Sequence, residues 1–151
     1  MPAHSAPKIK KTKVPTTLGL RQSQPREAIF GVIRSAKGPL TIPEIHAQTL
    51  KGSRGNKTGI ATVYRTINLL LENELIRAVV LPTGETRYES KEIGEHHHHF
   101  KCNTCNKVFD LEFCPVGFPE GTTIPGGYRI DSHDVTFFGL CPDCQSSKKR
   151  K

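Results

Sequence analysis

The sequence has no tryptophan, one methionine and only 7% aromatic residues among its 151 positions. It also has no apolar run near the roughly 20 residues that span a membrane. The N-terminal lysines precede neither an apolar run nor a small-residue cleavage site, so no secretory signal peptide is indicated. We therefore expect a cytoplasmic protein that makes no contact with a membrane. Its 35% hydrophobic and 24% charged residues are typical of a soluble globular fold.

Motifs of catalysis are also missing. No nucleophile lies in a recognisable motif, and no glycine-rich loop of the kind that holds a phosphate occurs. These absences predict a protein that is not an enzyme. Two alternatives stay open: a metallohydrolase built from histidines and carboxylates, and an RNA-binding zinc-ribbon module. The second would need exposed aromatic side chains for base stacking, and this chain has few aromatic residues.

The net charge of +8 is spread unevenly. Residues 1–17 and 145–151 each contain four Lys or Arg and no acidic residue. Residues 18–92 hold 11 basic and 7 acidic residues, whereas residues 93–144 hold 3 and 7. The basic half predicts contact with nucleic acid through phosphate neutralisation, and the acidic half predicts a separate task. The basic tails alone are equally consistent with a role in solubility.

Residues 18–90 show the pattern of three helices followed by a β-hairpin. Apolar side chains recur at helical spacing in three stretches, and Thr41 with Glu44 forms a capping box before the second. The helices are predicted at residues 25–37, 41–50 and 60–75, and the strands at 76–81 and 86–89 around a turn at 82–85. This order indicates a winged helix-turn-helix domain.

In such a domain the third helix enters the major groove of DNA. Its apolar stripe faces the core, so Thr58, Thr62 and Arg65 are expected on the opposite side and Tyr64 on the flank. We predict that Thr62, Tyr64 and Arg65 contact DNA. A solvated helix face without a partner is the alternative.

The remaining segments differ in composition. Residues 1–17, with three prolines and few large apolar side chains, predict a disordered basic arm. Residues 91–95 predict a hinge, and residues 146–151 a basic tail. Residues 96–145 predict a small metal-binding domain, with strands at 100–102, 108–113, 127–130 and 135–140.

Two Cys-x-x-Cys pairs lie in this second domain, Cys102 with Cys105 and Cys141 with Cys144. Four thiolates in two such pairs form a closed, tetrahedral, structural zinc site, and the cytosol keeps thiols reduced. A pair of redox-active motifs is the alternative. The fifth cysteine, Cys114, follows no such pattern, and we expect it to be a partly buried small hydrophobic residue.

Four consecutive histidines, His96 to His99, precede the first pair. On a strand, alternate residues face opposite sides, so His97 and His99 would serve one pocket and His96 and His98 another. The nearest partners by residue type are Glu89, Asp110 and His133. Imidazole with carboxylate suits an exchangeable ion such as iron, manganese or zinc. A closed zinc site beside a harder, open site indicates a structural metal and a sensed metal.

Together these features resemble the ferric uptake regulator superfamily of metal-dependent bacterial repressors, over roughly residues 18–145. The opening Gly19-Leu20-Arg21-x-x-x-Pro25-Arg26, the helix from Ile60 to Leu70, the histidine run and both cysteine pairs resemble the family's motifs in order and spacing. The resemblance implies an α/β fold, with an N-terminal winged helix-turn-helix domain and a small C-terminal α/β dimerisation domain that carries the four-cysteine zinc site.

The resemblance also implies function. A homodimer would bind double-stranded operator DNA and repress transcription when a regulatory divalent metal, foremost iron, is bound; zinc and peroxide sensors of the same family are the alternatives. Tyr64 and Arg65 match DNA-contacting residues, and Arg21 lies near a position that reaches the minor groove. The metal ligands that match are Glu89, His97, His99 and Asp110 at the regulatory site, and His96, His98 and His133 at a further site.

The chain departs from the family pattern at two places. The histidine that commonly precedes the second helix is replaced by Gly38-Pro39-Leu40, and His46 follows later. A carboxylate-bearing helix is replaced by residues 114–121, which leaves Glu120 as a candidate fourth ligand of the further site. Zinc sensors usually place a cysteine near Glu89, which is absent here, whereas peroxide sensors place an aspartate at the position of Asp110.

Overall fold

The computed structural model describes residues 23–52, 58–93 and 96–148. The helices are α1 (Gln24–Ser35), α2 (Ile42–Gly52), α3 (Ile60–Glu72) and α4 (Pro142–Lys148), with a short 3₁₀ turn, η2 (Lys91–Ile93). The strands are β1 (Ile76–Val80), β2 (Thr86–Ser90), β3 (His98–Cys102), β4 (Val108–Leu111), β5 (Thr123–Ile124), β6 (Tyr128–Arg129) and β7 (Thr136–Gly139). Arg21 and the N-terminal arm lie outside the described residues.

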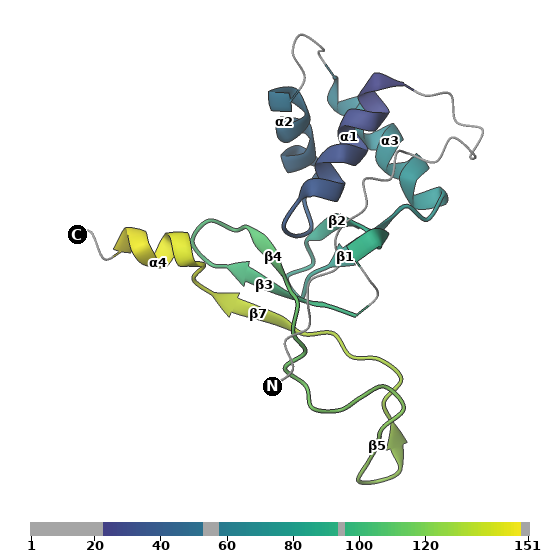
Figure 1. Ribbon diagram of the computed structural model, residues 1–151, viewed down its shortest axis with the longest axis vertical. Coiled ribbons are helices and arrows are strands. Elements are labelled where there is room, and N and C mark those ends of the chain that lie inside the picture. Colours follow the sequence, from purple (N-terminus) through teal and green to yellow (C-terminus); the bar gives the residue numbers. More distant parts are fainter. Residues whose placement is uncertain (1–22, 53–57, 94–95, 149–151) are drawn as a thin grey trace.

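Helices α1, α2 and α3 gather at one end of the molecule around a common apolar core (Figure 1). Ile29, Ile33, Ile45, Val63 and Ile67 are each at most 1% exposed. Burying a side chain of this size stabilises the fold by roughly 1.5–3 kcal/mol. The three predicted helices are therefore confirmed, and most of each apolar stripe faces this core. Leu50 in α2 and Ile60 at the start of α3, each 42% exposed, were expected on the buried face and are not.

The helix ends follow the local sequence. Pro25 lies in the first turn of α1, where its missing N–H leaves no hydrogen bond unmade. Ahead of α2, the backbone N–H of Thr41 donates to Glu44 Oε2 at 2.8 Å, and the N–H of Glu44 donates to Thr41 Oγ1 at 3.3 Å. The predicted capping box is thus confirmed.

Strands β1 and β2 form the antiparallel hairpin of the wing, in a register that pairs Arg77 with Glu89. The turn is shorter than predicted, because the N–H of Leu81 donates to the carbonyl of Glu85 at 3.0 Å and leaves a three-residue loop. That loop ends on Gly84 with φ of +81°. Three-residue hairpin loops use a left-handed residue at this position, which glycine adopts without strain.

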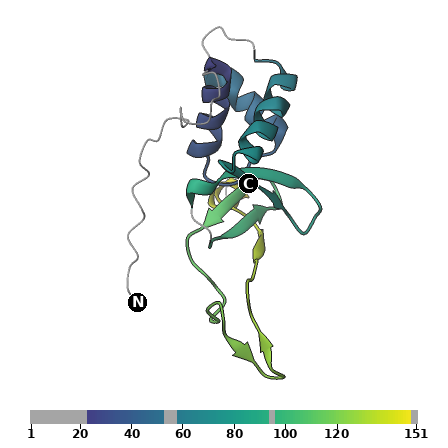
Figure 2. The same ribbon diagram turned by 90° about the vertical axis from the view of Figure 1, so that its right-hand side faces the viewer.

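In the C-terminal half, β3 lies between the antiparallel β4 and the parallel β7. Between β4 and β7 the chain runs away from this sheet to the small β5–β6 hairpin (Figure 2). The strand predicted at 127–130 is only two residues long, because Gly126 and Gly127 form the turn with φ of +94° and +81°. The sequence did not predict β5 or α4, since elements this short show no periodic pattern.

The two halves of the molecule are in contact. The N–H of Asp110 on β4 donates to the carbonyl of Lys37, in the loop between α1 and α2, at 3.0 Å. In the same loop, Gly38 lies so close to the carbonyl of Val108 that a side chain there would collide with β4. The loop between α1 and α2 therefore packs against β4.

Arg87 on β2 joins the halves through its side chain, which is only 2% exposed. It donates to Glu44 Oε2 at 2.9 Å and to the carbonyl of Pro39 at 3.2 Å, both in the helical half. It also donates to the carbonyl of Asn106, next to β4, at 3.0 Å.

Among the helices of the described residues, none has the length and apolar character that a membrane span requires.

Candidate metal centres and DNA-facing helix

Helix α3 presents part of its surface to solvent. Tyr64 is 52% exposed, Arg65 is also exposed, and Thr62 is half-buried. Thr58, however, is only 6% exposed, so its expected outward position is wrong. The residue precedes α3, where helical periodicity does not apply, and its carbonyl lies 2.8 Å from His46 Nε2. DNA contact by Thr62, Tyr64 and Arg65 stays a prediction, as does contact by the undescribed Arg21.

The four paired cysteines meet at one end of the three-stranded sheet. Cys102 ends β3, Cys105 follows it in the turn, Cys141 lies directly before α4 and Cys144 lies in α4. Their sulfur atoms are all within 4.8 Å of one another, and those of Cys105 and Cys141 are 3.8 Å apart. Thiolates bound tetrahedrally to zinc at 2.3 Å are also roughly 3.8 Å apart. The four-cysteine cluster thus has the dimensions of a structural zinc site.

The protonation of this cluster also fits a cation. Backbone N–H groups of Cys105 and Cys141 donate to the sulfur of Cys102 and lower its pKa to about 6. A hydrogen bond with the sulfur of Cys141 raises the pKa of Cys144 to about 12. Cys102 therefore forms a thiolate readily, and ionisation of Cys144 beside it requires a compensating positive charge. A bound Zn²⁺ would supply that charge.

Glu89, His97, His99 and Asp110 form a second group, called here the Glu89 cluster. Glu89 Oε2 lies 3.2 Å from Nε2 of both His97 and His99. Asp110 Oδ1 lies 3.9 and 3.7 Å from the same two nitrogens. Glu89 comes from the wing, whereas the other three residues come from β3, β4 and the segment before β3. The cluster therefore draws ligands from both halves of the molecule.

The electrostatics of the Glu89 cluster fit a divalent cation. Burial raises the pKa of Glu89, but hydrogen bonds from His97, His99 and Arg77 outweigh it and hold that pKa well below its usual range. Burial and the charge of Glu89 raise the pKa of Asp110 to about 6. Asp110 Oδ1 is buried and makes no hydrogen bond within the described chain. Two imidazoles, two carboxylates and an unsatisfied oxygen suit iron, manganese or zinc.

Arg77 is a member of this site that the sequence did not reveal. Its Nε donates to Glu89 Oε1 at 2.6 Å, and its Nη2 lies 3.0 Å from His97 Nδ1. Arg77 faces Glu89 across the hairpin. The predicted turn at 82–85 would have placed Ala78 there instead, so the error in loop length hid the contact.

His46 does not take the place of the histidine that the family commonly has before the second helix. The ring of His46 contacts the carbonyl of Thr58 in the helical half, and it belongs to none of the donor groups found among the described residues. The position of the missing histidine is instead part of the tight contact between Gly38 and β4.

A third group contains His96, His98 and His133, as predicted, and also Cys114. Cys114 is exposed, so the prediction of a partly buried hydrophobic residue is wrong. Its connection between β4 and β5 leaves the sheet and gives the side chain no core to enter. Glu120 is outside the group, with its Oε1 3.8 Å from His96 Nδ1.

Comparison with known sequences identifies the relatives of this chain. Residues 17–138 match the model of the ferric uptake regulator family. The transcriptional regulator FurA of Mycobacterium tuberculosis is 31% identical over 123 residues, which cover 80% of this chain and 70% of FurA. The ferric uptake regulation protein of Campylobacter upsaliensis is 27% identical over 135 residues, covering 88% and 85% of the two chains.

Solved structures agree. The Helicobacter pylori ferric uptake regulator, described as having three functional metal-binding sites, matches with 26% identity and a TM-score of 0.56 over 85% of each chain. The Francisella tularensis regulator with iron matches with 26% identity and a TM-score of 0.58, over 85% of this chain and 96% of that one. Such proteins are metal-dependent transcriptional regulators and not enzymes. The chain belongs to the ferric uptake regulator family.

Proposed function

We propose that this protein is a cytoplasmic transcriptional repressor that binds operator DNA as a homodimer when a divalent metal is bound by the Glu89 cluster. The observation that carries the proposal is the origin of the four donors. Glu89 lies on the wing of the DNA-binding half, and His97, His99 and Asp110 lie in the other half. A metal held by all four would connect the halves.

The connection explains a response to metal. A bound divalent ion supplies a positive charge that two buried carboxylates share. Glu89 can join His97, His99 and Asp110 only while the wing rests against the sheet, as in Figure 1. A ligand shifts a conformational equilibrium by its differential affinity for the two states. Metal binding therefore favours this arrangement, which fixes the direction in which each α3 faces.

Iron(II) is the proposed regulatory metal, with manganese(II) and zinc(II) as the other candidates. The Glu89 cluster contains imidazole and carboxylate donors and no thiolate, a set that suits iron and manganese better than it suits a soft metal. The likeness to a regulator solved with iron supports the same assignment. Cys102, Cys105, Cys141 and Cys144 are the proposed ligands of the structural zinc.

Exposed aromatic residues in the C-terminal half support a homodimer. Phe137 and Phe138 lie on β7, an edge strand of the three-stranded sheet, and are 39% and 44% exposed. Phe113 and Tyr128 are 60% and 70% exposed. Monomeric proteins rarely leave so much apolar surface and an unprotected sheet edge in water. A second copy of the chain that covers this surface would bring two α3 helices to one DNA duplex.

DNA binding can be tested by selection from a random duplex library with the full chain and manganese(II), followed by affinity measurements on the enriched sequence. We expect a duplex preference over single-stranded DNA and RNA, and half-sites about one helical turn or a multiple of it apart. Arg65→Ala should weaken specific binding by about 1–3 kcal/mol, whereas Arg129→Ala, on the distant β6, should not. A higher affinity for RNA or for single-stranded DNA than for the duplex, or an unchanged affinity in Arg65→Ala, would reject the proposed interface.

A further inference from the structure

The third donor group lies away from the Glu89 cluster, on another side of β3. His98 begins β3 and His96 lies two residues before it, Cys114 lies in the connection between β4 and β5, and His133 lies between β6 and β7. One candidate donor atom of each residue lies within 4.8 Å of the others. Three separate segments of the chain therefore converge on one point.

His98 is the buried member of this group. It is 0% exposed, and neither of its ring nitrogens has a hydrogen-bond partner among the described residues. Its ring centroid lies 5.0 Å from that of His96 and 5.1 Å from that of His133. A buried imidazole whose nitrogens have no hydrogen-bond partner is costly unless a ligand such as a cation binds it.

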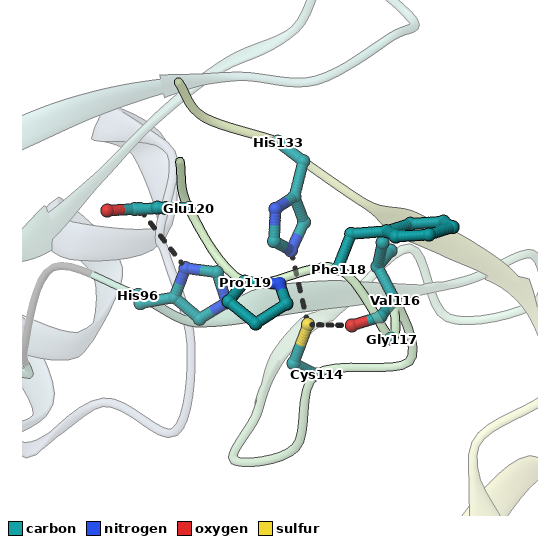
Figure 3. A pocket seen from close by; sticks show the side chains of 8 residues that line it. All are labelled: His96, Cys114, Val116, Gly117, Phe118, Pro119, Glu120 and His133. Carbon is teal, nitrogen blue, oxygen red and sulfur yellow. Dashed lines mark hydrogen bonds and ion pairs between the residues drawn. The ribbon is translucent and has the colours of Figure 1, made fainter. Parts of the chain in front are cut away.

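The thiol of Cys114 faces the same point. Figure 3 shows its sulfur directed toward His133, and Sγ lies 3.1 Å from His133 Nε2. Cys114 and His133 both line a pocket of about 480 Å³. Glu120 is less well placed, because its side chain is 62% exposed and lies 3.8 Å from His96. The chain thus offers a thiol where the family resemblance implies a carboxylate.

We propose that Cys114 is the fourth ligand of a zinc site with His96, His98 and His133, and that this site fastens the β5–β6 hairpin to the sheet. Three imidazoles and one thiolate form a borderline-soft tetrahedral set that suits zinc and disfavours manganese, which prefers oxygen donors. The Glu89 cluster has the opposite preference, so the chain would sort two metals between two sites.

The hairpin needs such a fastening. β5 and β6 pair only with each other in the described chain, and the segment between Cys114 and His133 runs away from the sheet to this hairpin (Figure 2). Cys114 and His133 lie near the two ends of this excursion. A metal bound by both, and by His96 and His98, would close the base of the excursion. Phe118 and Tyr128, both at least half exposed, would be held in place with it.

The test is site-resolved alkylation of the full chain, with iodoacetamide and peptide mass spectrometry. The protein keeps its four-cysteine zinc and receives either no added metal, one further equivalent of zinc(II), or manganese(II). Zinc should slow alkylation of Cys114 about tenfold or more, as expected for a bound thiolate, and manganese should not. Equal rates with and without zinc would overturn the proposal.

Variants separate Cys114 from its neighbours. His133→Ala should remove the protection of Cys114, whereas Glu120→Gln should retain it. In cobalt(II) titrations of the same zinc-loaded protein, the wild type should show a thiolate-to-cobalt charge-transfer band that Cys114→Ser lacks. Hydrogen exchange in residues 123–129 should slow on zinc addition in the wild type and not in Cys114→Ser. Protection lost in Glu120→Gln, with zinc still bound by Cys114→Ser, would assign the ligand to Glu120 and overturn the proposal.

This inference extends the proposed function but does not depend on it. Cys114→Ser leaves the Glu89 cluster intact, so its manganese-dependent DNA binding should equal that of the wild type. Protection of Cys114 by zinc without any DNA binding would reject the proposed function alone. DNA binding without protection would reject the Cys114 site alone.

Discussion

Glu89 Oε2 lies 3.2 Å from Nε2 of His99, although the two residues belong to different halves of the molecule. The contact places a buried carboxylate of the wing against the first strand of the C-terminal sheet. Arg77 holds the other oxygen of Glu89 at 2.6 Å. The carboxylate therefore already has a cation, the Arg77 guanidinium, before any metal arrives.

Replacing Arg77 by leucine should strengthen metal binding at the Glu89 cluster. Without the guanidinium, two carboxylates share the site with no fixed positive charge, and a divalent ion has no ion pair to displace. Because Arg77 is partly exposed, the gain should be modest, about fivefold for an ion pair of about 1 kcal/mol. Calorimetric titration with manganese(II) measures it, and Arg129→Leu is the control. Weaker binding in Arg77→Leu would mean that the guanidinium orients Glu89 for the metal.

Replacing Arg87 by methionine should lower the free energy of unfolding by about 2–3 kcal/mol. The substitution keeps the apolar volume but removes the donor to the carbonyls of Pro39 and Asn106. It also removes the ion pair with Glu44, whose carboxylate keeps the capping bonds from Thr41. Urea denaturation of the zinc-loaded protein measures the change. Arg129→Met, at an exposed residue that forms an ion pair with the exposed Asp131, should change it by less than about 0.5 kcal/mol. An equal change in the free energy of unfolding at both positions would mean that Arg87 does not stabilise the contact between the two halves.

Cys102→Ser should release the structural zinc and disrupt both the C-terminal half and the dimer, because the folding of a small metal domain includes the free energy of metal binding. Elemental analysis and sedimentation give the two readouts. Cys114→Ser is the matched control and should keep the four-cysteine zinc and the dimer. A Cys102→Ser protein that stays dimeric with that zinc in place would rule out the structural assignment.

The parts of the fold in which apolar residues recur periodically over many positions could be predicted from the sequence. The capping box of Thr41 and Glu44 and most positions of the apolar stripes of α1, α2 and α3 are local signals, and the structure confirms them. The two histidine-containing donor groups could also be predicted from the sequence. Alternate residues of a strand face opposite sides, which separates His97 and His99 from His96 and His98.

The remaining features depend on distances that sequence does not give. Arg77 faces Glu89 only because the hairpin loop has three residues and not four, a difference decided by Gly84 in the left-handed region. Cys114 reaches His133 only because an irregular connection of the chain turns back toward β3. Neither a short loop nor an irregular excursion leaves a periodic trace in the sequence.

The central claim is that one divalent ion, held by ligands of both halves, strengthens DNA binding. The most direct measurement is the affinity of the selected duplex for wild type, His99→Ala and the control His46→Ala, under anaerobic conditions with iron(II), manganese(II) or no added metal. In the wild type, metal should tighten DNA binding roughly 5–150-fold, and DNA should tighten metal binding by the same factor. His46→Ala should keep this ratio, and His99→Ala should lose it while retaining its zinc and its dimer. Identical metal dependence in His99→Ala and wild type would contradict the account.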